Sequence, residues 1–313
     1  MFSPLDVSVI RSRKFQCSYY ASKESMWSTS GIIAGEVMDD YKRANLALWN
    51  EWTEIHAKSE FYDLEGFKAG NTSLNAFEIE EMGEVTGKSL LHLQCHFGLD
   101  TMSWARLGAK ATGVDFSDQA IELANSINDE LELDASFICS DIYELPDVLT
   151  GRFDIVYTSN GILSWLPDLE NWAKVIAHFL KPGGIFYMAE FHPFAYVFDD
   201  REEATDLRVH YPYFHSNEPL IIEVEGTYAD RSAPVSQPIS YEWDHSLSEV
   251  LNALISAGLR IESFNEYPFS LYPMFPSMME KSADGVWRLK EKDGAVPLMF
   301  SLKATAVGGK RSI

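Results

Sequence analysis

The chain has 313 residues, of which 46% are hydrophobic and 13% aromatic, and its formal net charge is −22 at pH 7. This size allows a sizeable core, built as one large domain or as a domain with an insertion, and the acidity argues against DNA or RNA as the substrate. No apolar run reaches the roughly 20 residues that cross a bilayer, no secretory signal pattern is recognisable, and three scattered cysteines suit a reducing cytoplasm rather than a disulfide framework.

Residues 1–37 differ in composition from the rest of the chain. The segment is rich in Ser, shows no sustained period, and carries the bases Arg11, Arg13, Lys14 and Lys23 in an otherwise acidic protein. We predict a poorly ordered N-terminal extension over these residues. The alternative is an arm that packs on a partner subunit.

Residues 38–85 form the second predicted unit, a helical lid. A helix is expected over about Asp39–Glu60 and another over Leu74–Met82, because apolar residues recur there at spacings of three and four. The apolar positions of the first helix are Tyr41, Ala44, Leu48, Trp52 and Ile55. The aromatic side chains either pack plainly against the sheet or close a pocket through Trp49, Trp52 or Tyr62.

Strands and helices alternate from residue 86 onward. The expected strands are Ser89–Leu93, Ala111–Asp115, Ser136–Ser140, Phe153–Ser159 and Gly184–Glu190. The expected helices are Leu99–Leu107, Ser117–Asn128 and Leu169–Leu180. Ser117 is a suitable N-cap, and Pro182-Gly183-Gly184 is expected to end the third helix. This alternation predicts an α/β protein with a doubly wound, mostly parallel sheet.

The stretch at about 191–244 interrupts this alternation and is rich in aromatic residues and histidines. Ile221–Tyr228 alternates apolar and polar residues, and Ile239–Trp243 is expected to pair with it antiparallel. A helix at Ser246–Ala257 and strands at Leu259–Tyr267 and Leu298–Thr305 then complete a seven-stranded sheet within a core of residues 86–313. The insertion follows the fifth strand, so we predict a β-rich cover over the substrate.

The segment 90–115 carries the most chemical information. It is a strand, a turn, a helix and a second strand that ends in Asp115, which places a carboxylate in the crevice beyond the strand ends. A carboxylate there suits the two hydroxyls of a ribose, so a nucleoside-containing cofactor is expected. A nicotinamide dinucleotide is disfavoured, because the turn holds the bulky Gln94, His96 and Phe97 instead of the glycines that cradle a pyrophosphate.

The order of segments resembles that of the class I S-adenosylmethionine-dependent methyltransferases, from about Leu74 to the C-terminal region. That family typically has acid-x-Gly-x-Gly-x-Gly after its first strand, and the aligned residues are His92 to Gly98, with sequence HLQCHFG. The further matches are Val114-Asp115-Phe116-Ser117, Phe153-Asp154-Ile155-Val156, Leu180-Lys181-Pro182-Gly183-Gly184 and, more weakly, Asp141-Ile142. The resemblance implies a Rossmann-like methyltransferase fold that binds S-adenosyl-L-methionine.

The first motif departs from the family pattern. His92 stands where the family has an acid, and Gln94 and His96 replace two glycines. In one interpretation the loop keeps its path with negative φ at positions 94 and 96, and both side chains line the methionine end of the cofactor. In the other, cofactor binding is lost and the fold remains as a scaffold. The retained Asp115 and Asp141 favour the first.

The resemblance also implies residue roles. Asp115 would accept both ribose hydroxyls, and Phe116 would pack on the adenine face. Asp141 would accept from the exocyclic amine, unless it is only a helix cap or a solvated acid, while the Ile142 backbone N–H would pair with a ring nitrogen. The remaining cofactor contacts are assigned to Gly98, under the sugar and methionine backbone, and to Asn160, beside the sulfonium.

The function implied is methyl transfer to a small-molecule acceptor by in-line displacement. The alternative is a non-catalytic binding or regulatory protein with the same fold. If the acceptor must lose a proton, the candidate bases are His192, His245 and Tyr241, each of which could instead only brace the pocket. No metal is expected, because the spacing of His210 and His215 matches no familiar ligand pair. We expect a cytoplasmic protein without nucleic-acid or membrane partners, and the aromatic residues near the cover are compatible with a homodimer.

Overall fold

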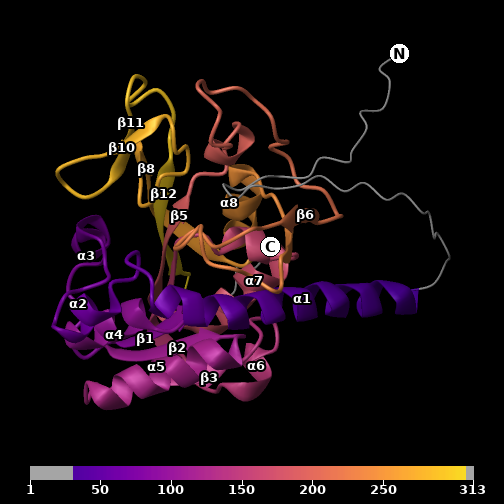
Figure 1. Cartoon of the computed structure of the whole chain (residues 1–313). Coiled ribbons are helices and arrows are strands. Elements are labelled where there is room, and N and C mark those ends of the chain that lie inside the picture. The colour runs from indigo at the N-terminus through magenta and orange to yellow at the C-terminus, as the bar shows by residue number, and fades with distance from the viewer. Residues whose placement is uncertain (1–30, 308–313) are drawn as a thin grey trace.

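A seven-stranded sheet forms the centre of the computed structural model, which describes residues 31–307 (Figure 1). The first 30 residues, and with them most of the predicted extension, lie outside the described residues. The strand order is β3-β2-β1-β4-β5-β12-β8. The strands are β1 Ser89–Leu93, β2 Lys110–Asp115, β3 Ala135–Cys139, β4 Phe153–Ser159, β5 Leu180–Phe191, β8 Leu259–Tyr267 and β12 Met299–Ala306.

Neighbouring strands from β3 to β5 pair in parallel, whereas β12 is antiparallel to both β5 and β8. The predicted doubly wound sheet is therefore confirmed. Strand β5 begins earlier than expected, because Leu180 already pairs with Phe153. The preceding helix thus ends at Phe179, and the Pro182-Gly183-Gly184 sequence lies inside the strand instead of terminating the helix.

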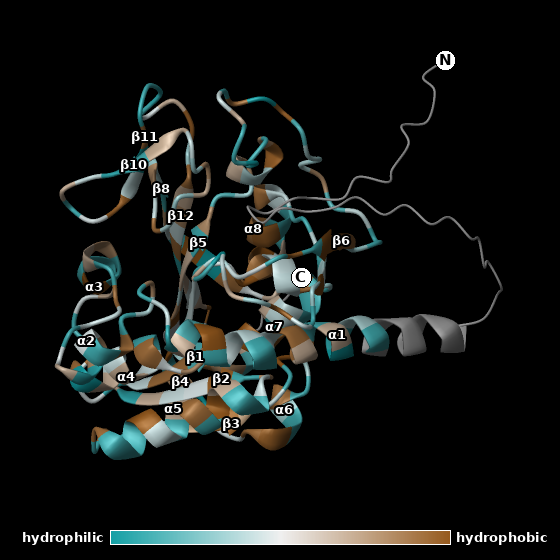
Figure 2. Ribbon diagram, viewed as in Figure 1, coloured by the Kyte–Doolittle hydropathy of each residue, from teal (hydrophilic) through white to brown (hydrophobic). Residues whose placement is uncertain are grey.

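Successive residues of the central strands are buried in different hydrophobic clusters. Leu91 and Val156 pack in one cluster with α7 (Leu169–Phe179) and α8 (Leu247–Ser256). Leu90 and Ile155 pack in another cluster with α3 (Ala76–Met82) and α4 (Leu99–Arg106). Side chains alternate between the two faces of a strand, so apolar runs of this kind suit strands that are covered on both sides. Figure 2 shows the hydrophobic residues gathered along the strands, with hydrophilic residues on the outer helix surfaces.

Local signals explain where the core helices begin. The Ser117 hydroxyl accepts a hydrogen bond from the Ala120 amide and starts α5 (Asp118–Glu130), as the N-cap prediction required. A capping box between Ser246 and Glu249 starts α8. The remaining helices of the core are α4 (Leu99–Arg106) and the short α6 (Leu145–Val148).

The segment before β1 contains α1 (Gly31–Ala57), α2 (Leu64–Lys68) and α3 (Ala76–Met82). Helix α1 is longer than predicted and contacts both α5 and the strand β7 (Ile239–Glu242) of the insertion (Figure 1). Helix α3 begins two residues later than predicted, because Asn75 and Glu78 form a capping box at its start. Among the described residues, none of these or the later helices combines the length and apolarity needed to span a bilayer.

Two insertions extend beyond the sheet. The first follows β5 and begins with the 3-10 helix η2 (Ala195–Val197), and its centre is the antiparallel pair β6 (Leu220–Glu223) and β7 (Ile239–Glu242), as predicted. Another 3-10 helix, η1 (Leu163–Trp165), connects β4 to α7. Strand β6 ends earlier than expected, since the Thr227 amide donates to the Asp230 carbonyl and turns the chain. The second insertion was not predicted. It forms a three-stranded sheet of β9 (Phe269–Ser270), β10 (Met279–Lys281) and β11 (Trp287–Leu289).

Candidate cofactor and substrate site

A cavity of about 870 Å³ lies at the carboxyl ends of β1, β2 and β4. This is the edge at which ligands bind in open α/β sheets, and the volume is in the range of small-molecule sites. Its walls come from the loops that follow these strands, from α1, and from both insertions. The predicted cofactor residues are all in its lining: Gln94, His96, Gly98, Asp115, Phe116, Asp141, Ile142 and Asn160.

The loop after β1 has left-handed backbone at alternate positions. The φ angles are 59° at Gln94, 52° at His96 and 78° at Gly98. The expectation of negative φ at positions 94 and 96 is therefore wrong. Left-handed backbone costs a residue with a Cβ about 1–2 kcal/mol, and such strain concentrates at functional sites. The loop thus keeps a conformation that glycine would adopt freely, although two of the three residues are not glycine.

Asp115 holds this loop in place. Its Oδ2 accepts a hydrogen bond from the His96 amide at 2.7 Å, and its Oδ1 accepts from the Ser117 amide at 2.9 Å. Burial raises the pKa of the Asp115 carboxyl to about 6, although these amide bonds favour the charged form. Each carboxylate oxygen can accept more than one hydrogen bond, so Asp115 can serve the loop and a ligand together.

Gly98 has a packing role as well as a place in the cavity wall. It is the N-cap of α4 with φ of 78°. A Cβ at this position would lie 2.3 Å from Cε1 of Phe137, which is far inside contact distance. Glycine is therefore required here by both the backbone conformation and the close approach of Phe137.

Several buried polar atoms in the cavity lining have no hydrogen-bond partner among the described residues, and three of them belong to the loops that follow β1 and β4. They are Oε1 of Gln94, Nδ1 of His96 and Oδ1 of Asn160. A buried polar atom without a partner costs about 1–3 kcal/mol. A ligand that presents complementary donors and acceptors would satisfy these atoms, so their placement fits a polar ligand at this end of the cavity.

The residues at the β3 end of the cavity have other partners in this structure. Asp141 lies 3.0 Å from the Lys42 ammonium of α1, and it accepts a hydrogen bond from the Tyr143 amide at 2.8 Å. Phe116 and Ile142 line the same part of the cavity. Asp141 thus contacts Lys42 and the Tyr143 amide, and it also lines the large cavity.

Aromatic side chains form one wall. Trp49 and Trp52 of α1 pack near Trp165 of η1, with the Trp49 and Trp165 ring centroids 5.2 Å apart. Tyr62 is in contact with Tyr228 of the first insertion through their hydroxyl groups. All five residues line the cavity. A lid function for the N-terminal segment stays a prediction, but the three residues proposed for it do reach the pocket.

Asp100 is a cavity residue that the sequence reasoning missed. It is the second residue of α4, its carboxylate accepts from the Ser159 hydroxyl at 3.0 Å, and burial raises its pKa. His92, at the position of the family acid, lies with Nδ1 2.8 Å from the Thr101 hydroxyl. Burial lowers the pKa of His92 to about 3, so its imidazole is neutral. Acids are common in the first turn of a helix, because they interact favourably with the helix dipole. The position of Asp100 in the sequence therefore gave no sign of a binding role.

The three candidate bases lie outside the cavity lining. Nε2 of His192 lies 3.0 Å from a Glu266 oxygen, and Nε2 of His245 lies 2.7 Å from the Leu166 carbonyl oxygen. The Tyr241 ring packs against the Tyr41 ring, with the two planes tilted by 31° and the centroids 4.5 Å apart. A residue close to a strand end in the sequence can still point away from the cavity. These three side chains contact neighbouring segments instead.

The second insertion also contributes to the cavity. Its lining residues include Leu271, Tyr272 and Lys281. The stretch between Tyr267 and Leu298 carried no motif in the sequence analysis. The one available signal was the length of this stretch, because long segments without a predicted helix or strand are often functional.

Comparisons with known proteins agree with this arrangement. A family described as a methyltransferase domain matches residues 90–184. A ubiquinone biosynthesis O-methyltransferase of Coxiella burnetii is 33% identical over 114 residues, which are 36% of this chain and 47% of that protein. A protein of the same name from Xanthomonas oryzae is 27% identical over 146 residues, or 46% of this chain and 57% of that protein. The chain thus spans about half the length of these curated relatives.

Solved structures extend the likeness to the whole sheet. An S-adenosylmethionine-dependent methyltransferase from Mesorhizobium loti has a TM-score of 0.51 at 21% identity, and the match covers 76% of this chain and 99% of that one. One from Clostridium acetobutylicum has a TM-score of 0.51 at 14% identity, with coverage of 83% and 99%. Residues 90–184 thus match a methyltransferase domain, and the fold around the sheet is that of these solved S-adenosylmethionine-dependent methyltransferases.

Proposed function

We propose that the chain binds S-adenosyl-L-methionine in the large cavity and transfers its methyl group to a small-molecule acceptor. The observation that carries the proposal is Asp115, a buried carboxylate at the end of β2 that also holds the left-handed loop after β1. The match of residues 90–184 to a methyltransferase domain supports it.

The residues around the cavity suit the parts of this cofactor. Asp115 would accept hydrogen bonds from the ribose hydroxyls, and Phe116, Asp141 and the Ile142 amide would surround the adenine. Gly98 would leave room for the sugar. The unpartnered atoms of Gln94, His96 and Asn160 would receive the polar groups of the methionine part.

Asp100 offers the carboxylate that the first motif lacks. The cofactor carries an ammonium group, and the neutral His92 cannot supply a charge opposite to it. Asp100 lines the same cavity and has its pKa raised by burial, so a nearby cation would favour its ionised form. We assign the ammonium contact to Asp100.

For methyl transfer, the main task of the protein is to align the acceptor with the methyl group of the cofactor. When bound, the sulfonium supplies an already activated methyl group. The aromatic wall formed by Trp49, Trp52, Tyr62, Trp165 and Tyr228 would exclude water and hold a flat or apolar acceptor against it.

Proton abstraction by the protein is a minor contribution in this proposal. His96 is an imidazole in the cavity lining, but burial lowers its pKa to about 3, which makes it a weak base at neutral pH. If the acceptor must lose a proton, this imidazole is therefore a weak candidate for the base. We further propose a cytoplasmic protein that acts without nucleic-acid or membrane partners and is compatible with a homodimer.

Calorimetry with S-adenosylmethionine and S-adenosylhomocysteine tests the proposal. Asp115→Asn keeps the shape of the side chain but removes its charge and one acceptor oxygen. Because hydrogen bonds to charged groups contribute about 1.5–3 kcal/mol, the affinity should fall by about 10-fold to 100-fold or more. Asp118→Asn is the control, since this acid at the start of α5 is exposed and outside the cavity lining. No binding by the wild-type protein, or an unchanged affinity of Asp115→Asn, would contradict the proposal.

The non-catalytic alternative needs a separate assay. Its support in the sequence was the loss of two glycines, but Gln94 and His96 retain a glycine-like backbone, which weakens that argument. Formation of S-adenosylhomocysteine in the presence of flat phenolic or amine acceptors would establish the enzyme. Tight cofactor binding with no turnover across such a panel would favour a regulatory protein.

A further inference from the structure

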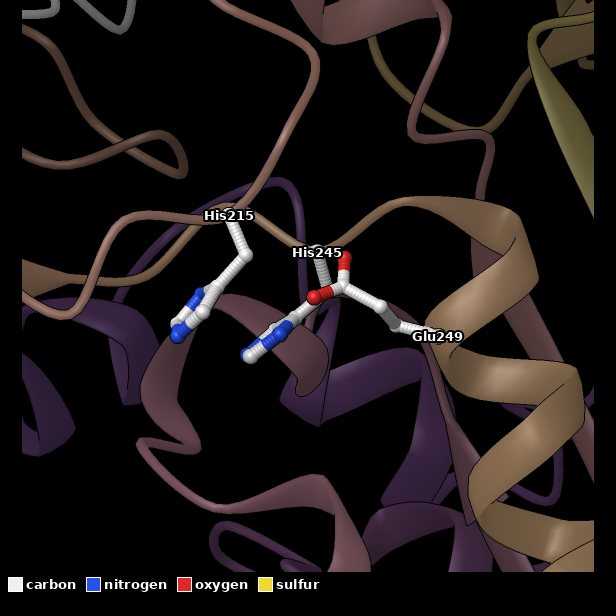
Figure 3. A group of neighbouring side chains, drawn as sticks. All are labelled: His215, His245 and Glu249. Atoms are coloured by element: carbon white, nitrogen blue, oxygen red, sulfur yellow. The ribbon is translucent and has the colours of Figure 1, made fainter.

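A second polar cluster lies apart from the large cavity. His215 comes from the first insertion, His245 directly precedes α8, and Glu249 lies in the first turn of α8 (Figure 3). One ligand atom from each residue lies within 4.8 Å of the other two. None of the three lines the large cavity, so the cluster has no part in the function proposed above.

The hydrogen bonds of the two histidines determine which nitrogens are available. Nδ1 of His215 lies 2.8 Å from the Asp244 carbonyl oxygen, and Nε2 of His245 lies 2.7 Å from the Leu166 carbonyl oxygen. A carbonyl oxygen only accepts hydrogen bonds, so these nitrogens carry the protons. The other nitrogens, Nε2 of His215 and Nδ1 of His245, therefore have free lone pairs. Metal-binding histidines are typically oriented in this way, by a second hydrogen bond from the ring to a carbonyl or carboxylate.

Glu249 can contribute an oxygen without giving up its structural role. Its Oε2 accepts hydrogen bonds from the amide and the hydroxyl of Ser246, both at 2.7 Å, and so completes the capping box of α8. The second oxygen, Oε1, is not used in that capping box.

We propose that His215, His245 and Glu249 form a site for a divalent transition metal, with Zn²⁺ as the best match. Two neutral imidazoles and one carboxylate are a common donor set for this ion. To reach the 2.0–2.2 Å of zinc–ligand bonds, the ligand atoms would have to approach one another. The two imidazole rings are stacked with 12° between their planes, so binding would also have to turn them until their in-plane lone pairs converge.

The ion would connect the first insertion, at about 191–244, to the helices and loops beside the sheet. It would connect the loop that carries His215 to the start of α8 and, through the hydrogen bond of His245, to Leu166 directly after η1. The sequence analysis expected no metal because it considered the spacing of His210 and His215 alone. The three ligands are separated by up to 34 positions along the chain, so only the folded structure brings them together.

Metal binding to the full-length, untagged and metal-stripped protein tests the proposal. Zn²⁺ is titrated by calorimetry, and Co²⁺ is titrated by visible absorption, which distinguishes bound from free cobalt. Two variants remove a ligand, His215→Ala and Glu249→Gln, and the second keeps the capping box because glutamine also serves at that position. His210→Ala is the matched control, since this exposed histidine lies in the same loop and outside the cluster.

We expect one Zn²⁺ per chain in the wild-type protein and in His210→Ala, with at least a 10-fold weaker affinity in both ligand variants. We also expect the melting temperature to rise with Zn²⁺ in the wild-type protein and to stay unchanged in His215→Ala. Absence of a stoichiometric site, retention of full affinity in His215→Ala and Glu249→Gln, or a cobalt spectrum with thiolate charge-transfer bands would overturn the proposal. Cofactor affinity is unaffected by any of these outcomes, so a failure here leaves the proposed function intact.

Discussion

The left-handed backbone at Gln94 predicts an unusual order of stability for two variants. Gln94→Ala and Gln94→Gly both remove the side chain beyond Cβ, and they differ in whether a Cβ is present. Alanine keeps the steric cost of the left-handed conformation, about 1–2 kcal/mol. Glycine removes this cost but loses about 0.5–1 kcal/mol through the greater freedom of the unfolded chain. The glycine variant should therefore be more stable than the alanine variant, by up to about 1.5 kcal/mol.

A helical position supplies the control for this comparison. Ser126 is exposed in the middle of α5, where glycine should be less stable than alanine by about 1 kcal/mol. The measurement is the guanidinium unfolding midpoint of all four variants, or their melting temperature, which changes by about 2–4 °C per kcal/mol in domains somewhat smaller than this chain. If alanine is more stable than glycine at position 94, as it is at position 126, the residue does not have positive φ and the interpretation of the loop is wrong.

Three further predictions concern Gly98, Glu190 and Asp115. Gly98→Ala combines backbone strain with a collision against Phe137, so thermal unfolding should show a loss of about 2–5 kcal/mol that Phe137→Leu only partly restores; a variant as stable as wild type would contradict this. Glu190 is buried and accepts hydrogen bonds from four backbone amides, including that of Gly161 at 2.5 Å. Glu190→Gln should therefore lower the unfolding free energy by about 1–3 kcal/mol. An unchanged melting temperature would refute a stabilising role of the Glu190 carboxylate. Asp115 has its folded-state pKa raised to about 6, so cofactor affinity measured by calorimetry should be constant above pH 7 and fall up to tenfold per pH unit below pH 6, whereas a flat profile would exclude an ionised Asp115 as the ligand.

The pKa of Asp115 also has a consequence for folding. Its folded-state value lies above the value of about 3.9 expected in the unfolded chain. Between about pH 4 and pH 6 the folded protein therefore binds more protons than the unfolded protein at this group. The contribution of Asp115 to the unfolding free energy falls as the pH rises through this window, and it is most favourable below pH 4.

Periodicity and turn chemistry determine most of the sheet. Strands β1, β4 and β8 have the predicted bounds, and Ser117 and Ser246 begin helices as expected. These signals are local, because the alternation of side chains and the satisfaction of helix-end amides depend on neighbouring residues. Asp115 was also recognisable, since a residue that ends a parallel strand must lie at the ligand-binding edge.

The directions in which side chains point, and the contacts between segments far apart in the chain, were determined by the tertiary structure. The backbone at Gln94 and His96 is held left-handed by the hydrogen bond from His96 to Asp115, which lies 19 residues later in the chain. His192 was chosen because it directly follows a strand, but its partner Glu266 holds it outside the cavity lining, and the Leu166 carbonyl does the same for His245.

The sequence by itself determined the order of strands and helices and the acid at the tip of β2, because those features are encoded by side-chain patterns over a few residues. The tertiary structure alone decided which polar atoms share the cavity with Asp115, and it brought His215 beside His245 and Glu249. Such encounters join segments far apart in the chain, and their geometry follows from how the whole core packs.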